Sequence, residues 1–402
     1  MRNTRLRDIC EVITKGTTPT TVGFSFVETG INFIKIENID EKGNVDIDNI
    51  AHINEECHAA LKRSQLREGD ILFSIAGAIG RTAIVNNDML PANTNQALAI
   101  IRINDNSVNR EYLRLFLTST VVKKQTERQK QGIAQVNLSL KNIGDLVVNL
   151  PNYTEQGEIV KELNTILLGI NEKKQVVSSL DELVKSRFIE MFGEPLSESY
   201  ITPFSQACFF NPKKSEKKDW TDETIISFIP MPLVSEHGEI NTGTLKTYKE
   251  VKTGFTYFRE NDVLFAKITP CMENGKGAIA QNLKNGIGFG STEFHVLRPI
   301  EGVSNPYWIY YLTAIDSFRI MAEKKMTGSA GQKRVPISFF ENMKVNLPPI
   351  KLQNEFAKFV KLIDKSKFVC HSKNFLCDIF TFSSSTIAYP SVVSIFVCPK
   401  RC

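Results

Sequence analysis

The side chains best suited to chemistry in this 402-residue sequence are Arg, Lys, Asn and Gln in polar, glycine-containing segments. Arg and Lys can bridge the edge of a guanine, and Asn or Gln can pair with an adenine. Glycines let the backbone approach a phosphate. For any one of these residues, the alternative to a DNA contact is that its side chain is an ordinary solvated surface charge. As a set they predict DNA contacts, made by Arg81, Asn95, Gln96, Lys130, Gln135, Lys141, Lys267, Lys276, Thr292, Lys333 and Arg334.

No catalytic set accompanies these residues. The sequence lacks a glycine-rich phosphate loop between a strand and a helix, and it lacks a GxSxG nucleophile turn. The five histidines form no i, i+4 pair, and none of the eight cysteines belongs to a CxxC pair or a Cys/His cluster with zinc spacing. We therefore predict no catalytic residues, no metal site and no directly bound cofactor. The rival hypothesis is an enzyme whose site these motifs do not reveal.

The two halves of the chain repeat each other at an offset of roughly 190 to 198 residues. The strand EGDILF at 68–73 returns as ENDVLF at 260–265, and LP at 150–151 returns as LP at 347–348. Between these landmarks each copy contains a small-residue segment, a β-branched strand, an aromatic helix and a basic loop. Gln156 and Gln353 keep the same offset. The duplication predicts either a larger scaffold or two equivalent binding modules that see two sites.

A long helix is predicted between the two copies. From Thr154 to Phe192 there is no proline, Thr154 can cap the start, and Gly193-Glu194-Pro195 ends the pattern. About 38 residues of helix span roughly 57 Å. Apolar residues recur at steps of three and four, which predicts a narrow seam along one face. Its members are Ile159, Leu163, Ile166, Ile170, Val177, Leu180, Val184 and Met191.

This seam favours a spacer arm that pairs with a second helix, and the alternative is a helix lying across one domain. The second helix is expected after the second Leu-Pro, where Phe356, Val360 and Ile363 repeat the spacing of the first seam. From Phe368 onward the sequence turns rich in Cys, Ser, Phe and Val, and the seam stops. Our hypothesis is a slipped reading frame near this point, and the alternative is a genuine short β extension.

The charge distribution supports only local DNA contacts. The net charge is +5, but five basic residues and one acidic residue lie from Lys365 onward, which leaves 44 basic and 43 acidic residues before it. A DNA interface must therefore come from local patches. No stretch approaches the roughly 20 apolar residues of a membrane span, and no apolar run follows the basic N-terminus. We expect a cytoplasmic protein.

The sequence resembles the specificity subunits of type I restriction-modification systems over about residues 1 to 367. The resemblance rests on LRDICEVITKGTTPT near the start, on GDILFSIAGAIGR and NDVLFAKITP, and on LPNYTEQGEIVKEL and LPPIKLQNEFAKFV at the two helix starts. The segment KSRFIEMFGEP at 185–195 is also typical of the family.

The resemblance implies an α/β (α+β) fold. It has two similar target-recognition domains with mixed sheets, joined by long antiparallel coiled-coil spacer helices, of which the second is truncated here. The expected segments are domain 1 at 1–151, the central spacer helix at 152–194, domain 2 at 195–348, the start of the second spacer helix at 349–367, and an aberrant tail at 368–402.

The resemblance also implies a function and partners. Each domain would read one half of a bipartite target in double-stranded DNA, with no chemistry of its own. Two methyltransferase subunits, which use S-adenosylmethionine, would dock on the spacer helix, and an endonuclease-translocase subunit would join them. The expected docking residues are Ile159, Leu163, Ile166, Ile170, Val177, Leu180 and Val184. A truncated inactive subunit is the main alternative. A standalone RNA-binding module is disfavoured, since the loops lack interleaved aromatic residues.

Overall fold

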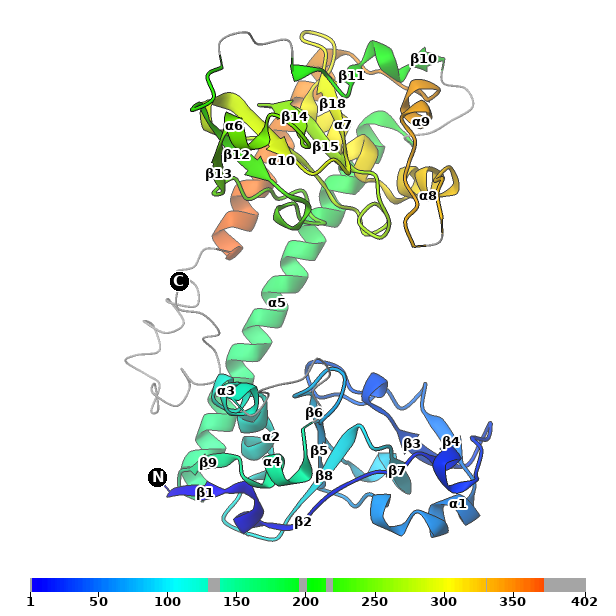
Figure 1. The fold of residues 1–402 in the computed structure, drawn as a ribbon, viewed down its shortest axis with the longest axis vertical. Helices are drawn as coiled ribbons and strands as arrows, with labels where there is room; N and C mark the ends of the chain where they lie inside the picture. Colours follow the sequence, from blue (N-terminus) through cyan, green and yellow to red (C-terminus); the bar gives the residue numbers. More distant parts are fainter. Residues whose placement is uncertain (1, 129–137, 195–200, 215–219, 330, 372–402) are drawn as a thin grey trace. The chain divides into compact units, whose positions relative to one another are not determined.

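The computed structural model describes residues 2–128, 138–194, 201–214, 220–329 and 331–371. The chain divides into two compact units, and the division falls inside the long helix α5 (Tyr153–Phe192), between Asn171 and Glu172. The first domain below comprises residues up to 171, and the second comprises 172–371. Figure 1 labels the elements of each.

The first domain contains an antiparallel sheet and a mixed sheet. The antiparallel sheet has the order β2 (Cys10–Lys15), β8 (Leu98–Ile103), β5 (Ile71–Ser74), β6 (Thr82–Ile84). The mixed sheet has the order β4 (Ala51–Ile53), β3 (Ile31–Ile34), β7 (Ala92–Thr94), with β3 and β7 parallel. A separate pair joins β1 (Arg2–Arg5) to β9 (Val147–Leu150). The helices are α1 (Glu55–Ala60), α2 (Arg110–Thr118), α3 (Thr120–Arg128), α4 (Leu140–Gly144) and the start of α5.

The second domain repeats this plan. Its antiparallel sheet has the order β11 (Cys208–Phe210), β18 (Phe294–Pro299), β15 (Val263–Ala266), β16 (Gly277–Ile279). Its mixed sheet has the order β13 (Leu245–Thr247), β12 (Ile225–Ile229), β17 (Ile287–Gly290), β14 (Thr256–Arg259), with β12 and β17 parallel. The separate pair is β10 (Thr202–Pro203) with β19 (Lys344–Val345). The helices are α6 (Tyr248–Val251), α7 (Pro306–Ala314), α8 (Asp316–Lys324), α9 (Ile337–Glu341), α10 (Ile350–His371) and the end of α5.

The predicted duplication is therefore confirmed in the fold, and it extends to buried polar contacts. Gln156 Oε1 accepts the Asn109 amide at 2.8 Å, and its Nε2 donates to the carbonyls of Ser107 and Pro151 at 2.8 and 2.9 Å. Gln353 makes the equivalent three bonds in the second domain. Both side chains are fully buried. Each glutamine thus ties the start of the long helix to the start of the aromatic helix in its own domain.

Replacing Gln156 by Ala leaves three buried backbone groups without these partners, at a cost of roughly 1–3 kcal/mol for each group that water does not reach. We expect the first domain to lose at least that amount in free energy of unfolding, measured by denaturant titration. Asn164→Ala is the matched control, because Asn164 is exposed on the same helix. Equal effects of the two variants would contradict the clamp role of Gln156.

The cap of α5 differs from the expectation. Asn152 Oδ1 accepts the Glu155 amide at 2.9 Å, and the Glu155 side chain accepts the Asn152 amide at 3.1 Å. The predicted cap at Thr154 is wrong because this reciprocal box already satisfies the first turn two residues earlier. The predicted end is confirmed: the helix stops at Phe192, and Gly193 adopts φ +75° with its N–H bonded to the Ile189 carbonyl.

The seam of α5 packs on two different cores. Ile159, Leu163 and Ile166 are buried in the core of the first domain, and Ile170 is partly buried against it. Val184 is buried in the core of the second domain, together with Phe188. Val177 and Leu180 are half-buried. The two ends of the seam therefore belong to the two domain cores.

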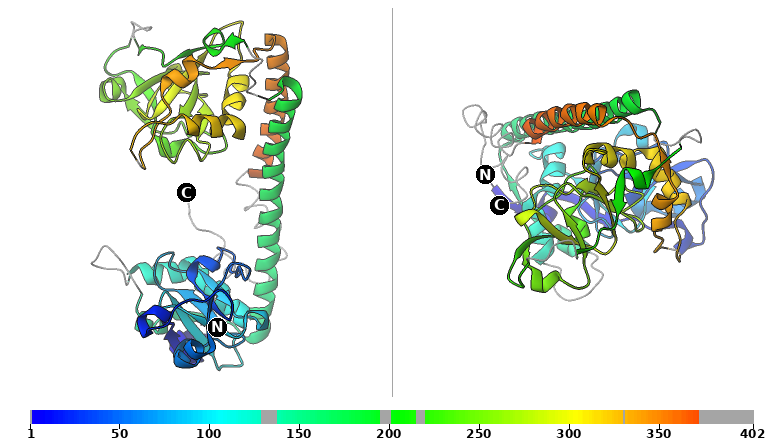
Figure 2. Two further views of the ribbon diagram at one scale, coloured as in Figure 1. Left: turned by 90° about the vertical axis from the view of Figure 1, so that its right-hand side faces the viewer. Right: turned by 90° about the horizontal axis from the view of Figure 1, so that it is seen from above.

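A second helix does pair with the C-terminal part of α5. The ring centroid of Phe356 in α10 lies 5.4 Å from Phe188 and 5.5 Å from Phe192. Eleven residues later Lys367 forms an ion pair with Asp181. Residue numbers rise along α10 while they fall along α5, so the predicted antiparallel pairing is confirmed here, and Figure 2 shows the two helices side by side. The described helix ends at His371, four residues beyond the predicted limit of 367. Residues 372–402 lie outside the described residues, so the tail hypotheses stay predictions.

Candidate nucleic-acid interface

Three segments of the second domain meet at one end of its antiparallel sheet. They are the loop 267–276 between β15 and β16, the turn 291–293 before β18, and the segment 325–336 between α8 and α9. The Lys267 amide donates to the Glu293 carbonyl at 2.9 Å, and the Val335 amide donates to the Lys267 carbonyl at 2.8 Å. The Thr269 amide donates to the Lys333 carbonyl at 3.0 Å. We call these three segments the second loop cluster.

The first domain builds the same junction. The Ile75 amide donates to the Ala97 carbonyl at 2.9 Å, and the Leu138 amide donates to the Ile75 carbonyl at 2.9 Å. These bonds join the loop 75–81 and the turn 95–97 to residues 138–139, which directly precede α4. We call this the first loop cluster. The two clusters are equivalent because the same strand ends and the same helix connection supply them.

Gly16 holds the chain that follows β2 close to the first loop cluster. The Thr17 amide donates to the Thr94 carbonyl at 3.1 Å, and the Thr18 hydroxyl bonds the Gln96 side chain. A Cβ at Gly16 would lie 1.9 Å from the Thr94 oxygen, so only glycine fits this approach. The segment KGTTPT at 15–20, part of the sequence that resembles the family, therefore positions the turn that carries Asn95 and Gln96.

Eight of the eleven predicted DNA contacts lie in the two loop clusters. Lys267, Thr292, Lys333 and Arg334 all lie in the second loop cluster, with Thr292 and Lys333 exposed. Asn95 and Gln96 lie in the first loop cluster, with Gln96 exposed. Lys276 is half-buried where loop 267–276 returns to β16, and Lys141 is exposed on α4. Lys130 and Gln135 lie outside the described residues.

The two predicted arginines are held by the chain itself. Arg81 Nη1 donates to the Ile39 carbonyl at 2.9 Å. Arg334 forms a two-point ion pair with Glu293, in which Nε and Nη2 each lie 2.9 Å from a carboxylate oxygen. The hydrogen bond from Arg334 lowers the pKa of the Glu293 carboxyl, so the pair stays ionised at neutral pH. Glu293 is absent from the predicted set, although it directly follows Thr292 in the sequence.

Buried His295, in β18, hydrogen-bonds one segment of the second loop cluster. Its Nε2 lies 2.8 Å from the Val335 carbonyl and donates to it, and its Nδ1 lies 3.2 Å from Asn211 Nδ2 and accepts. This pattern requires a neutral ring. Burial lowers the pKa of His295 from 6.5 to about 4, while the neighbouring Lys267 lowers it further and Glu293 opposes the shift.

A pH dependence follows from the depressed pKa of His295. The unfolded chain binds a proton at this ring below pH 6.5 and the folded chain does not, so stability falls as the pH falls. We expect the second domain to lose roughly 2 kcal/mol between pH 7 and pH 5. Both tryptophans, Trp220 and Trp308, lie in this domain, so their fluorescence during urea titration reports it. His295→Gln should flatten the dependence, and an unchanged slope would contradict this assignment.

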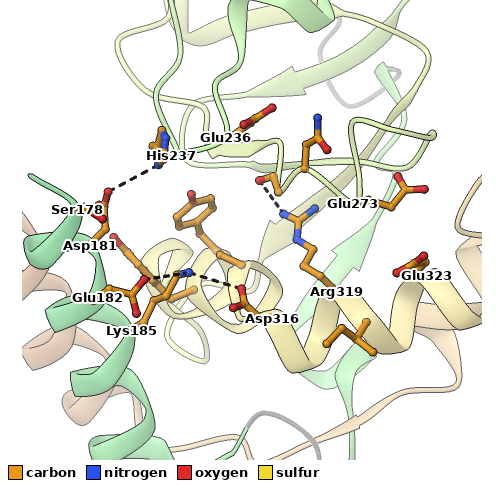
Figure 3. A pocket seen from close by; sticks show the side chains of 16 residues that line it. Ser178, Asp181, Glu182, Lys185, Glu236, His237, Glu273, Asp316, Arg319 and Glu323 are labelled. Atoms are coloured by element: carbon orange, nitrogen blue, oxygen red, sulfur yellow. Dashed lines mark hydrogen bonds and ion pairs between the residues drawn. The ribbon is translucent and has the colours of Figure 1, made fainter. Parts of the chain in front are cut away.

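The second domain also contains a cavity whose charge is unsuited to DNA. Figure 3 shows a cavity of about 370 Å³ formed by the second half of α5, the turn at 236–237, α7 and α8. Lys185 is paired there with Glu182 and Asp316, at 3.7 and 3.5 Å. Six carboxylates line it, more than its cations can balance, so it disfavours a phosphate backbone. They are Asp181, Glu182, Glu236, Glu273, Asp316 and Glu323.

Arg319 in this cavity serves the fold of the second domain. Its Nη1 and Nη2 donate to the carbonyls of Met272 and Gly275 at 3.1 and 3.2 Å, and its guanidinium lies 4.4 Å from the Phe265 ring centroid. Burial lowers its pKa to about 10, so it remains a cation at neutral pH. Arg319 therefore holds the loop 267–276 of the second loop cluster in place.

Within the described ranges between residues 2 and 371, no three His, Cys, Asp or Glu side chains come together as a metal site. None of the helices in the described part of the chain combines the length and the apolar character needed to cross a membrane.

The fold and the paired loop clusters define a duplicated two-domain α/β protein with one candidate recognition surface in each domain. The family model for the type I restriction modification DNA specificity domain matches residues 1–177 and 207–373. The chain belongs to this family. The predicted resemblance to the specificity subunits of type I systems is thereby confirmed.

The relatives of this chain include specificity subunits of type I restriction enzymes. The chain is 37% identical over 239 residues to the type I restriction enzyme EcoEI specificity subunit of Escherichia coli, which covers 59% of this chain and 39% of that protein. It is 24% identical over 386 residues to a putative type I restriction enzyme specificity subunit, MjaX, of Methanocaldococcus jannaschii, covering 89% and 85%. The chain thus matches about two fifths of the length of the Escherichia coli relative.

One solved structure shares the fold. It belongs to a study of complex assembly and conformational transition in the type I restriction-modification system. The TM-score is 0.54 at 16% sequence identity, over 97% of both chains. This supports the predicted fold of two mixed-sheet domains with long helices.

Proposed function

We propose that this chain is the DNA-reading subunit of a type I restriction-modification complex, and that each loop cluster reads one half of a bipartite target. The duplicated junction of three segments carries the proposal. It places exposed donors and amides at the same end of the same sheet in both domains, as two equivalent readers of two half-sites require. Membership of the DNA specificity family supports double-stranded DNA as the substrate.

We further propose that α5 receives the methyltransferase subunits through a face other than the predicted seam. Ile159, Leu163, Ile166 and Val184 are buried in the chain's own cores and offer no contact surface. Leu168, Val176 and Leu183 are 62%, 48% and 47% exposed. At 3.6 residues per turn these three side chains point within about 80° of one another. They form an exposed apolar stripe on the helix.

The complex would contain two methyltransferase subunits and an endonuclease-translocase subunit in the cytoplasm. S-adenosylmethionine would bind to the methyltransferase subunits and not to this chain. Adenine methylation is then the readout of recognition.

Co-expression with a methyltransferase subunit of a type I system, followed by genome-wide mapping of N6-methyladenine, tests this function. We expect a motif of two short half-sites with a fixed gap, present only when this chain is expressed. Methylation of the same motif without this chain would contradict the proposal. Co-purification of the subunits without methylation would favour the alternative, an inactive truncated subunit.

Docking is tested separately by Leu168→Asp combined with Leu183→Asp. We expect the double variant to lose co-purification with the methyltransferase while both domains stay folded, because charged groups on this stripe oppose burial in an interface. Glu158→Ala, at an exposed position of the same helix, is the control. Retained co-purification of the double variant would place docking elsewhere.

A further inference from the structure

We infer that Arg334 reads a guanine in the half-site of the second domain and that Glu293 is the positioning residue that aims it. The inference rests on the proposed function and names the base that one loop cluster recognises. The side chain of Arg334 is 41% exposed and that of Glu293 is 25% exposed, so the pair lies at the surface of the second loop cluster.

Counting donors identifies the free edge of the guanidinium. Arginine has five N–H groups. Glu293 takes one from Nε and one from Nη2, and the Gln332 carbonyl takes one from Nη1 at 3.1 Å. One N–H remains on each terminal nitrogen, Nη1 and Nη2. We assign to Gln332 the Nη1 N–H that points back along the side chain, so the two remaining donors, which no acceptor among the described residues occupies, form a fork at the end of the guanidinium.

Such a fork matches two adjacent acceptors. In the major groove only guanine presents two acceptors, O6 and N7, on one base, whereas adenine presents one acceptor and one donor there. The two-point ion pair fixes the plane of the fork before DNA arrives, so little side-chain freedom is lost on binding. The exposed neighbours Thr292 and Lys333 can bond the adjoining phosphates.

Among the described residues of the first loop cluster, no arginine–carboxylate pair matches this one. The Ala97 carbonyl accepts the Ile75 amide as the Glu293 carbonyl accepts the Lys267 amide, so Ala97 occupies the position of Glu293. Alanine has no carboxylate to orient an arginine. The turn beside it offers the amides of Asn95 and Gln96 instead. The two half-sites should therefore differ in sequence. The guanine read by Arg334 should lie in the half-site that the second domain binds.

The test uses the complex of the full chain with its methyltransferase and a set of duplexes. Each duplex replaces one base pair of the mapped motif. For the wild-type complex we expect one G·C pair whose replacement weakens binding roughly 10- to 100-fold. Arg334→Ala should reduce this ratio to nearly one at that pair and leave the ratios at other pairs unchanged.

Glu293→Gln separates base reading from charge. This variant keeps the arginine and removes an adjacent negative charge, so a mere phosphate contact would bind every duplex as tightly as before or tighter. A positioned fork instead predicts a smaller ratio at the same G·C pair, even while affinity for unrelated DNA rises. Lys252→Ala is the matched control, because Lys252 is 42% exposed and is likewise paired, with Asp222 at 3.0 Å. It should leave all ratios unchanged.

The outcomes are distinct. A wild-type complex without any sequence preference would overturn the proposed function and this inference with it. A wild-type complex that discriminates, with Arg334→Ala discriminating equally or losing affinity uniformly for all duplexes, would overturn the inference alone. Unchanged tryptophan fluorescence transitions of both variants would show that the second domain is folded in each measurement.

Discussion

Asp262→Ala is expected to destabilise the second domain by about 3–5 kcal/mol, since it leaves a buried arginine without its carboxylate. The Asp262 and Arg298 side chains are 1% and 4% exposed, and two hydrogen bonds of 2.8 and 2.7 Å join them. The carboxylate also accepts the Arg259 amide at 2.9 Å, which holds the turn into β15. Urea titration followed by tryptophan fluorescence measures the loss.

The repeat supplies the matched control, Asp70→Ala in the first domain. Asp70 pairs with Arg102 at 2.8 and 2.7 Å, but the Arg102 side chain is 15% exposed. Water can reach this arginine, so the cost should be smaller. The fluorescence transition of the second domain should move by less than about 0.5 kcal/mol, because the two sites share no partners. A loss below about 1 kcal/mol for Asp262→Ala would contradict the account of this buried pair.

Phe356→Ala is expected to cost about 3–5 kcal/mol, as large-to-small changes of buried aromatic residues do. Phe356 is fully buried between Phe188 and Phe192, where α10 meets the end of α5. The loss should appear in the same fluorescence transition, because these three rings belong to the core of the second domain.

Leu362→Ala on the same helix is the control for Phe356→Ala. Leu362 is 62% exposed, so its truncation should change the free energy of unfolding by less than about 0.5 kcal/mol. If the two variants cost the same, the opposite face of α10 would be covered, and the assigned packing of the two helices would be wrong.

The repeat made much of the fold predictable. The strands at 71–74 and 263–266, the two Leu-Pro stops and the long helix follow from local patterns that occur twice. Periodicity placed Ile159 and Val184 on one seam, but it could not show that different cores bury them. That information comes from packing between segments far apart in the sequence.

The sequence predicted many of the residues in the candidate site, but it did not predict how they contact one another. Polar loop residues such as Gln96, Thr292 and Lys333 do gather in the loop clusters. The pairing of Arg334 with Glu293 depends on a contact across 41 residues, which no local pattern encodes. Sequence reasoning therefore found the arginine and missed the carboxylate that determines which of its donors are free.

The central claim is that each loop cluster reads its own half of the target. The most direct test is methylation mapping for the double variant Asn95→Ala, Gln96→Ala, compared with the wild-type chain and the same methyltransferase. The account predicts that one half-site relaxes or changes while the other half-site and the gap stay as they were. A motif that stays identical in both halves, or loses both halves together, would contradict it.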